Sequence, residues 1–149
     1  MQQLGKPAKI ETGCQSIPVL SVSPAASDHA GLEALLRWPQ WKVHRAASLP
    51  SALAQLRYLR PTPLVVCERD LFHAAWQDLL MQTRLLPEPP VFIVTSRLAD
   101  DHLWAEALNL GAYDVLAKPF EPVELTRSLT SAWQHSQGQR EIVSNVAVA

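Results

Sequence analysis

The carboxyl ends of four predicted strands are the positions where chemistry is expected. The residues at these ends are Ser23 and Pro24, Glu68, Thr95 and Lys118. The carboxyl ends of parallel strands meet at one edge of a sheet, and ligands of such folds bind beyond that edge. The chemistry available to this set is an ion pair between Glu68 and Lys118, beside two hydroxyl groups.

Other arrangements that could carry chemistry are weak. The five histidines are scattered over different predicted elements. Two of them have a glutamate four residues later, His29 with Glu33 and His102 with Glu106. Two ligands on one helix make a poor metal site, so we expect no metal and no other cofactor. The chain also has no Ser-His-Asp order, nucleophile elbow or glycine-rich phosphate loop, which argues against an enzyme.

The elements that must position these residues are strands and helices in alternation. Apolar runs predict five strands, and stretches with apolar residues three and four apart predict a helix after each strand. The expected strands are Ile17–Val22, Trp41–Ala46, Leu64–Cys67, Val91–Thr95 and Tyr113–Ala117. Ser27 or Asp28 is the expected cap of the first helix, and the last helix is expected from about Glu121 to Gln134. This alternation is typical of an α/β fold with a parallel sheet.

Length and charge restrict the function further. The 149 residues predict one domain over residues 17–135, with an N-terminal extension (1–16) and a C-terminal tail (136–149). A net charge of -1 without a basic stripe argues against binding to nucleic acid. No apolar run is long enough to span a membrane, so we expect a cytoplasmic protein with both cysteines, Cys14 and Cys67, reduced.

The second half of the chain carries a specific motif set. A strand ends in Thr95, a helix closes with Ala107-Leu108 and Gly111-Ala112, and the segment Asp114–Phe120 reads DVLAKPF. This pattern resembles the receiver domain of bacterial response regulators, over about residues 17 to 135. The resemblance implies a (βα)5 doubly wound, CheY-like (flavodoxin-like) sheet in strand order 2-1-3-4-5 and a cis Lys118-Pro119 bond. It also implies a role in two-component or phosphorelay signalling.

The resemblance assigns roles to the residues at the strand ends. In receivers, an Asp after the third strand accepts a phosphoryl group, an acidic pair after the first strand helps to hold Mg²⁺, and a Thr or Ser and a Lys contact the phosphate. Here the acceptor position falls on Glu68, and the acidic pair falls on Ser23 and Pro24. Thr95 and Lys118 keep the phosphate-reading positions. Asp70 is the weaker candidate for the acceptor, because it would place Glu68 and Arg69 inside the central strand.

Charge explains why this pocket is expected to be degenerate. Three carboxylates against one lysine attract a divalent cation, whereas Glu68 and Lys118 alone sum to zero. Without Mg²⁺, phosphoryl transfer loses a main source of charge stabilisation. Asp70 and Asp28 are possible substitute ligands, but both are displaced from the mapped positions. We therefore expect no bound metal and no phosphorylation.

The Glu68–Lys118 pair has two interpretations. It could lock one conformation for signalling, or it could only satisfy two buried charges. Val115 takes the place of the aromatic residue that usually reports phosphorylation. Tyr113 lies two residues too early to replace that aromatic residue.

The expected mode of action is binding to another protein. Trp104 and Leu108 are four residues apart beside the inward face of the fourth helix and could form an exposed apolar strip. In the resembled family, the fourth helix, fifth strand and fifth helix commonly mediate dimers and docking. We expect a receiver-like domain that binds a histidine kinase or a downstream effector, or forms a homodimer, through this face. The alternatives are a receiver phosphorylated on Glu68 or Asp70, and a sensor for a small metabolite.

Overall fold

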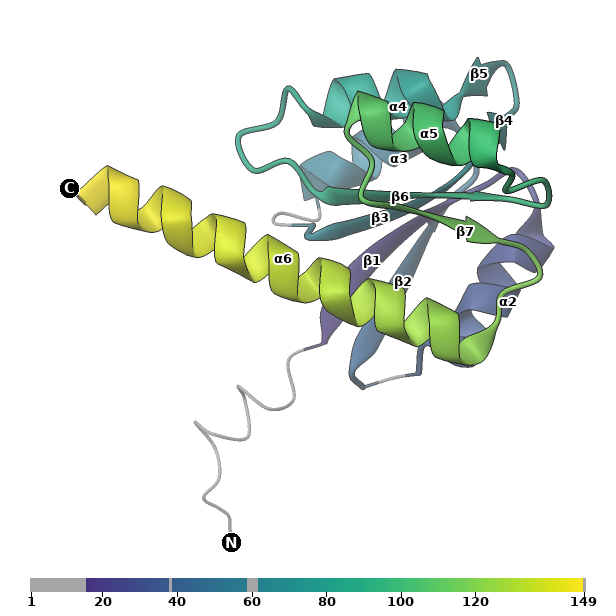
Figure 1. Cartoon of the computed structure of the whole chain (residues 1–149), viewed down its shortest axis with the longest axis horizontal. Helices are drawn as coiled ribbons and strands as arrows, with labels where there is room; N and C mark the ends of the chain where they lie inside the picture. Colours follow the sequence, from purple (N-terminus) through teal and green to yellow (C-terminus); the bar gives the residue numbers. More distant parts are fainter. Residues whose placement is uncertain (1–15, 38, 59–61, 149) are drawn as a thin grey trace, which may run out of the picture.

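The computed structural model describes residues 16–37, 39–58 and 62–148 (Figure 1). Most of the expected N-terminal extension, including Cys14, lies outside the described residues. Side chains are described up to residue 139. No helix in these ranges combines the length and apolar character that a membrane crossing requires.

Five parallel strands form the central sheet. Their order is β2-β1-β3-β6-β7, which is the predicted order 2-1-3-4-5 once a small ribbon is left out of the numbering. The strands are β1 (Ile17–Val22), β2 (Trp41–Ala46), β3 (Leu64–Glu68), β6 (Val91–Ser96) and β7 (Asp114–Ala117). The predicted doubly wound, CheY-like fold is therefore confirmed.

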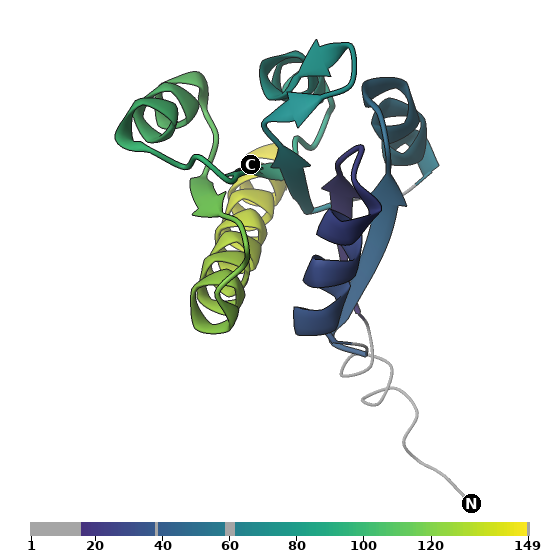
Figure 2. The ribbon, with the colours of Figure 1, turned by 90° about the vertical axis from the view of Figure 1, so that its right-hand side faces the viewer.

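Five helices cover the two faces of this sheet. They are α2 (Ala26–Leu35), α3 (Leu49–Tyr58), α4 (Trp76–Thr83), α5 (Asp101–Leu110) and α6 (Pro122–Val148). Figure 2 looks along the sheet and shows α3, α4 and α5 on one side, with α2 and α6 on the other. This three-layer arrangement is what right-handed crossovers between parallel strands produce.

Each layer of helices encloses its own core. Successive residues of a strand point to opposite faces, so Val65 and Cys67 of β3 pack under α3 and α4, whereas Leu64 and Val66 pack under α6. All four are at most 3% exposed. The apolar run of this central strand is thus explained by burial on both faces.

Helix α5 begins and ends as its sequence predicts. The side chain of Asp100 accepts a hydrogen bond from the backbone N–H of Leu103 at 2.9 Å and caps the first turn. Gly111 ends the helix with φ 108°, a left-handed conformation that glycine adopts without a steric penalty.

The start of α2 differs from the prediction. Neither Ser27 nor Asp28 caps the helix, because the N-cap is Ala25, which has no capping side chain. Asp28 lies in the first turn, and its carboxylate contacts residues outside the helix. That tertiary contact takes the place of the expected cap.

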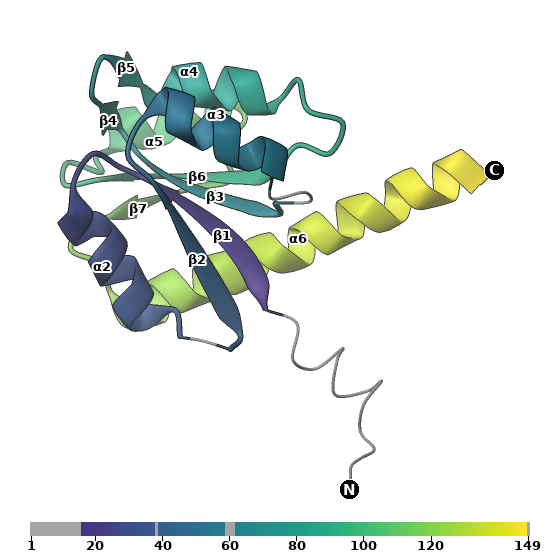
Figure 3. The ribbon, with the colours of Figure 1, turned by 180° about the vertical axis from the view of Figure 1, so that it is seen from behind.

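The end of the chain also differs. Residues 136–148 were predicted to be a separate tail, but the structure continues α6 to Val148. Figures 1 and 3 show its last part extending past the sheet. Once the first turns are packed by Leu125, Leu129 and Ala132, adding further turns costs little, because the nucleation cost of a helix is met only once.

A short antiparallel ribbon was not predicted. It consists of β4 (Asp70–Leu71) and β5 (Ala74–Ala75) and lies between β3 and α4. His73 at its turn has φ 64°, and its ring contacts the ring of Phe72. Two-residue strands leave too few alternating positions for a sequence pattern to indicate them.

Candidate functional site

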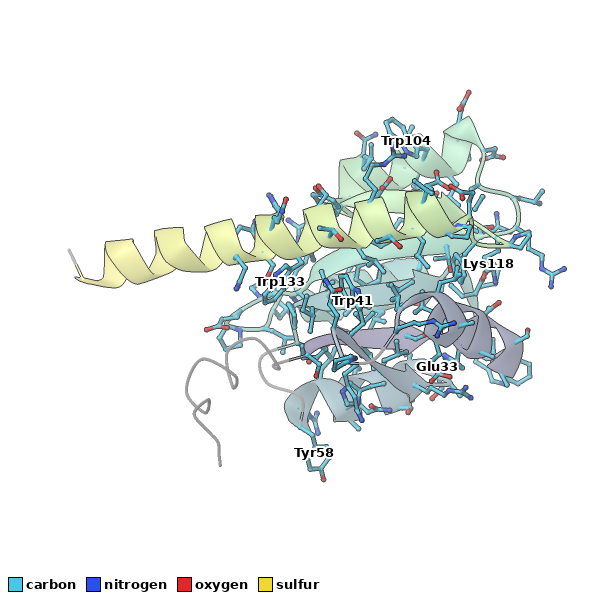
Figure 4. All side chains as sticks on the ribbon, turned by 90° about the horizontal axis from the view of Figure 1, so that it is seen from below. Glu33, Trp41, Tyr58, Trp104, Lys118 and Trp133 are labelled. Atoms are coloured by element: carbon cyan, nitrogen blue, oxygen red, sulfur yellow. The ribbon has the colours of Figure 1, made fainter. Side chains whose placement is uncertain are left out.

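The carboxyl edge of the sheet brings the predicted site residues together. Glu68 is the last residue of β3 and is the register partner of Thr95 in β6. Ser23 directly follows β1, and Lys118 directly follows β7. In Figure 4, Lys118 lies at the end of the molecule where α6 begins. The side chains of Ser23, Glu68 and Thr95 are buried.

Glu68 and Lys118 form an ion pair, as expected. The contact joins Oε1 of Glu68 to Nζ of Lys118, and both side chains are nearly enclosed, with 11% and 10% of their surface exposed. The second carboxylate oxygen, Oε2, accepts a hydrogen bond from the backbone N–H of Asp70 at 2.9 Å. Glu68 therefore contacts both the residue that follows β7 and the ribbon that follows β3.

Asp28 is a third charged member of this site. Its Oδ2 accepts a hydrogen bond from Nζ of Lys118 at 2.7 Å and another from Oγ of Ser23 at 2.6 Å. Sequence reasoning set Asp28 aside because it lies five residues beyond Ser23. The first turn of α2 places Asp28 beside Ser23 at the end of β1. Its position at the predicted start of a helix was the only feature of the sequence that could have indicated this.

The charge of the pocket must be corrected accordingly. Two carboxylates, Glu68 and Asp28, face one ammonium group, Lys118, so the sum is -1 and not zero. The earlier count failed because it included only residues that directly follow strands. Lys118, which follows β7, contacts both Asp28 of α2 and Glu68 of β3.

Burial and pairing act in opposite directions on these groups. Burial raises the pKa of the Asp28 carboxyl, but hydrogen bonds from Lys118 and Ser23 outweigh it and hold that pKa below its ordinary value. Burial lowers the pKa of Lys118, but Asp28 and Glu68 together raise it above its ordinary value. Both shifts favour the charged forms.

The residues present do not fit the Mg²⁺ ion of a working receiver. Mg²⁺ requires near-octahedral oxygen ligands. Ser23 uses its hydroxyl to donate to Asp28, and Pro24 has no side-chain donor atom. The two carboxylates that remain hold Lys118, so the ammonium group stands where a cation would have to be.

The histidine pairs are not brought into metal-binding clusters. Within the described ranges, no three or more His, Cys, Asp or Glu side chains are grouped so that they could hold a metal ion. Glu33 instead accepts hydrogen bonds from Arg45, and His29 is buried. Cys67 is buried as well, and burial raises the pKa of its thiol.

Val115 is the residue that the resemblance places at the switch-aromatic position. Val115 is buried in β7 opposite Val94 of β6. The hydroxyl of Tyr113 shares a hydrogen bond with Oγ of Ser131 in α6. Tyr113, the residue before β7, is therefore bound to α6.

The predicted interface residues lie on the surface of α5. Trp104 is 51% exposed and Leu108 is partly buried. Figure 4 shows Trp104 on α5, on the other side of the view from Tyr58 of α3. On helix α6, Val123 is 68% exposed.

Comparison with solved structures supports the fold. No protein-family model matches the sequence, and the curated proteins give no match. Solved structures do match. A signal receiver domain of an HD domain-containing protein from Pseudomonas fluorescens is 27% identical with a TM-score of 0.75, covering 85% of this chain and 93% of that one.

Two further solved structures have a similar fold. A response regulator from Chloroflexus aurantiacus, described as putative, is 28% identical with a TM-score of 0.73, covering 80% of this chain and 98% of that one. The chemotaxis response regulator CheY4 of Vibrio cholerae is 19% identical with a TM-score of 0.70, covering 78% and 98%. The Lys118-Pro119 bond is cis, as the resemblance implied. Sheet order, motif and neighbours together show that the chain has the CheY-like fold and is similar to response regulator receiver domains.

Proposed function

We propose that this receiver domain signals by binding a protein partner in a fixed conformation, without phosphoryl transfer at Glu68. The observation that carries the proposal is the cluster around Lys118. Its Nζ contacts Oε1 of Glu68 and Oδ2 of Asp28, so both acids of the pocket are paired before any ligand arrives.

The chemistry of phosphoryl transfer supports this interpretation. Transfer depends on positioning and on neutralising charge with metal ions and cationic groups. Here the metal-binding positions hold Ser23 and Pro24. Moving Lys118 away to admit Mg²⁺ would break two ion pairs of low exposure, and a buried charge that loses its partner is costly.

Glu68 also gives the pocket a lasting negative charge. Its carboxylate reaches one methylene further than an aspartate would, and it already contacts Lys118. The proposed result is a lock that connects β3, β7 and α2 in one state. Its partner is a histidine kinase or a downstream effector in the cytoplasm.

The alternative of a phosphorylated receiver has less support. Asp70 is the other candidate acceptor, but its side chain is 73% exposed and pairs with Arg69. It lies in the ribbon after β3, outside the cluster around Lys118. A metabolite sensor is not favoured either, because the polar atoms at the strand ends already bind one another.

The test is incubation with a small phosphodonor and Mg²⁺, followed by intact-mass analysis. We expect the wild-type chain and the Glu68→Gln variant to keep their masses. Glu68→Asp should also stay unmodified, since restoring the acceptor type does not restore the acids missing at Ser23 and Pro24. A stable added phosphoryl group on Glu68 or Asp70 would contradict the proposal. Modification of Glu68→Asp alone would contradict its metal argument.

A further inference from the structure

His29 is a buried polar side chain that the proposed lock does not use directly. It lies in α2 and is 4% exposed. Its Nε2 is 2.9 Å from the backbone carbonyl of Ser23, and its Nδ1 is 2.7 Å from Oγ of Ser21. Both ring nitrogens are therefore engaged.

The hydrogen-bond partners of His29 indicate which ring nitrogen donates a hydrogen. A backbone carbonyl only accepts, so Nε2 carries the hydrogen and donates it to Ser23. In the neutral ring, Nδ1 is then an acceptor and takes the hydroxyl hydrogen of Ser21. A single imidazole ring thus connects α2 to two residues at the end of β1.

The His29 ring holds the start of α2 against the end of β1. Ser23 is held from the other side, since its backbone N–H donates to the carbonyl of Ala46 at 3.0 Å. The backbone N–H of Ala25 donates to Oγ of Ser23 at 3.1 Å. Asp28 directly precedes His29 in α2, so an anchored His29 also restricts where the Asp28 carboxylate can lie.

We infer that His29 is a positioning residue: its ring, held by Ser21 and Ser23, places Oδ2 of Asp28 on Nζ of Lys118. The inference rests on the proposed function, because it makes the β1–α2 connection a second determinant of the lock beside Glu68. It requires no phosphoryl chemistry and no identified partner.

A purely structural role is the competing explanation. Burying two hydrogen bonds under α2 would stabilise the fold even if Asp28 found Lys118 without help. The experiment must therefore report on Lys118 itself and not on overall stability.

The reactivity of Lys118 provides that readout. The full chain is treated with trace acetic anhydride at fixed pH, and peptide mass analysis gives labelling of Lys118 relative to exposed Lys42. Losing Asp28 lowers the pKa of Lys118, and each unit of that change raises the reactive neutral amine about tenfold. Asp28→Asn is the reference for full release.

The inference predicts a specific order among the variants. His29→Leu should raise relative labelling of Lys118 about tenfold, as Asp28→Asn does. His29→Gln keeps an amide donor for the Ser23 carbonyl and should stay near wild type. Ser128→Ala is the matched control, because Ser128 is buried and bonds Asp114 away from the pocket. It should leave the labelling unchanged.

Two results would overturn the inference. One is a folded His29→Leu variant with wild-type labelling, and the other is a rise in Ser128→Ala equal to that in His29→Leu. If His29→Leu does not fold, Ser21→Ala decides, since it removes only the bond to Nδ1: increased labelling supports positioning, and wild-type labelling rejects it. Phosphorylation of the chain would contradict the proposed function. It would not change the result of this labelling experiment.

Discussion

Lys118 binds two carboxylates that approach it from different parts of the chain. Glu68 ends a central strand, and Asp28 lies in the first turn of a helix. Either acid alone would balance the charge of Lys118, so the two acids together leave the nearly enclosed site with a sum of -1. Both acids bind the ammonium group, and the Ser23 hydroxyl donates to the Asp28 carboxylate.

Removing Asp28 should weaken the fold moderately. Asp28→Asn leaves Lys118 with Glu68, so we expect the free energy of unfolding at pH 7 to fall by about 1.5–2 kcal/mol, at the lower end of the range for hydrogen bonds to charged groups. Urea unfolding measures this. Asp70→Asn, at an exposed position, is the control and should change stability by less than about 0.5 kcal/mol.

The effect of Asp28 should also depend on pH. Its pKa is lowered in the folded state, so its contribution is complete above its ordinary pKa of 3.8 and is lost as the pH falls through the folded value. The gap between wild type and Asp28→Asn should therefore shrink below about pH 4. Lys118, whose pKa is raised, contributes fully below 10.5 and loses its contribution above that pH. A gap that stays constant down to pH 2 would contradict the pairing.

Residue types at the strand ends could be predicted, but their geometry could not. Glu68, Thr95 and Lys118 were found because strand ends converge at one edge of a parallel sheet. Asp28 was named only as a displaced substitute ligand, and its contact with Lys118 was not predicted because its place depends on how α2 begins. The N-cap is Ala25, which no capping preference would have selected.

At the scale of elements, the strands that are buried on both faces were the ones that the sequence predicted best. Strands β3 and β6 are apolar throughout because helices cover both faces, and their bounds were predicted to within one residue. The β4–β5 ribbon and the continuation of α6 had no such pattern. Two-residue strands carry almost no periodicity, and Gly138 and Ser136 in α6 resemble a helix end.

Two glycines in helical surroundings should respond in opposite ways to alanine. A Cβ on Gly138 of α6 meets nothing within 4 Å, so Gly138→Ala should stabilise the chain by about 0.5–1 kcal/mol. Gly111 has φ 108°, and a Cβ there would collide with the guanidinium of Arg84, which bonds the carbonyl of Leu110. Gly111→Ala should cost about 1–2 kcal/mol. Thermal unfolding compares them, and a destabilised Gly138→Ala would argue against a helix at that position.

At the scale of the whole molecule, if Glu68, Asp28 and Lys118 lock the pocket as proposed, binding surfaces remain as the means of signalling. The α5–β7–α6 face carries exposed Trp104, with exposed Val123 on α6. Large aromatic side chains at such places are common anchors of protein interfaces. A domain with a fixed pocket can still present this face to a partner.

Self-association through this face can be measured by sedimentation. If the face forms a homodimer, the wild-type chain should sediment as a dimer at high concentration and Trp104→Ala as a monomer. Tyr58→Ala removes an exposed aromatic residue from α3 and should behave as wild type. Equal masses for Trp104→Ala and wild type would exclude Trp104 as a dimer anchor.

The most direct test of the lock is a crystal structure determined with abundant Mn²⁺ as an anomalous substitute for Mg²⁺. We predict Nζ of Lys118 between the carboxylates of Glu68 and Asp28, with no anomalous peak beside them. A divalent ion coordinated by those two carboxylates, with Lys118 turned away, would contradict the central claim.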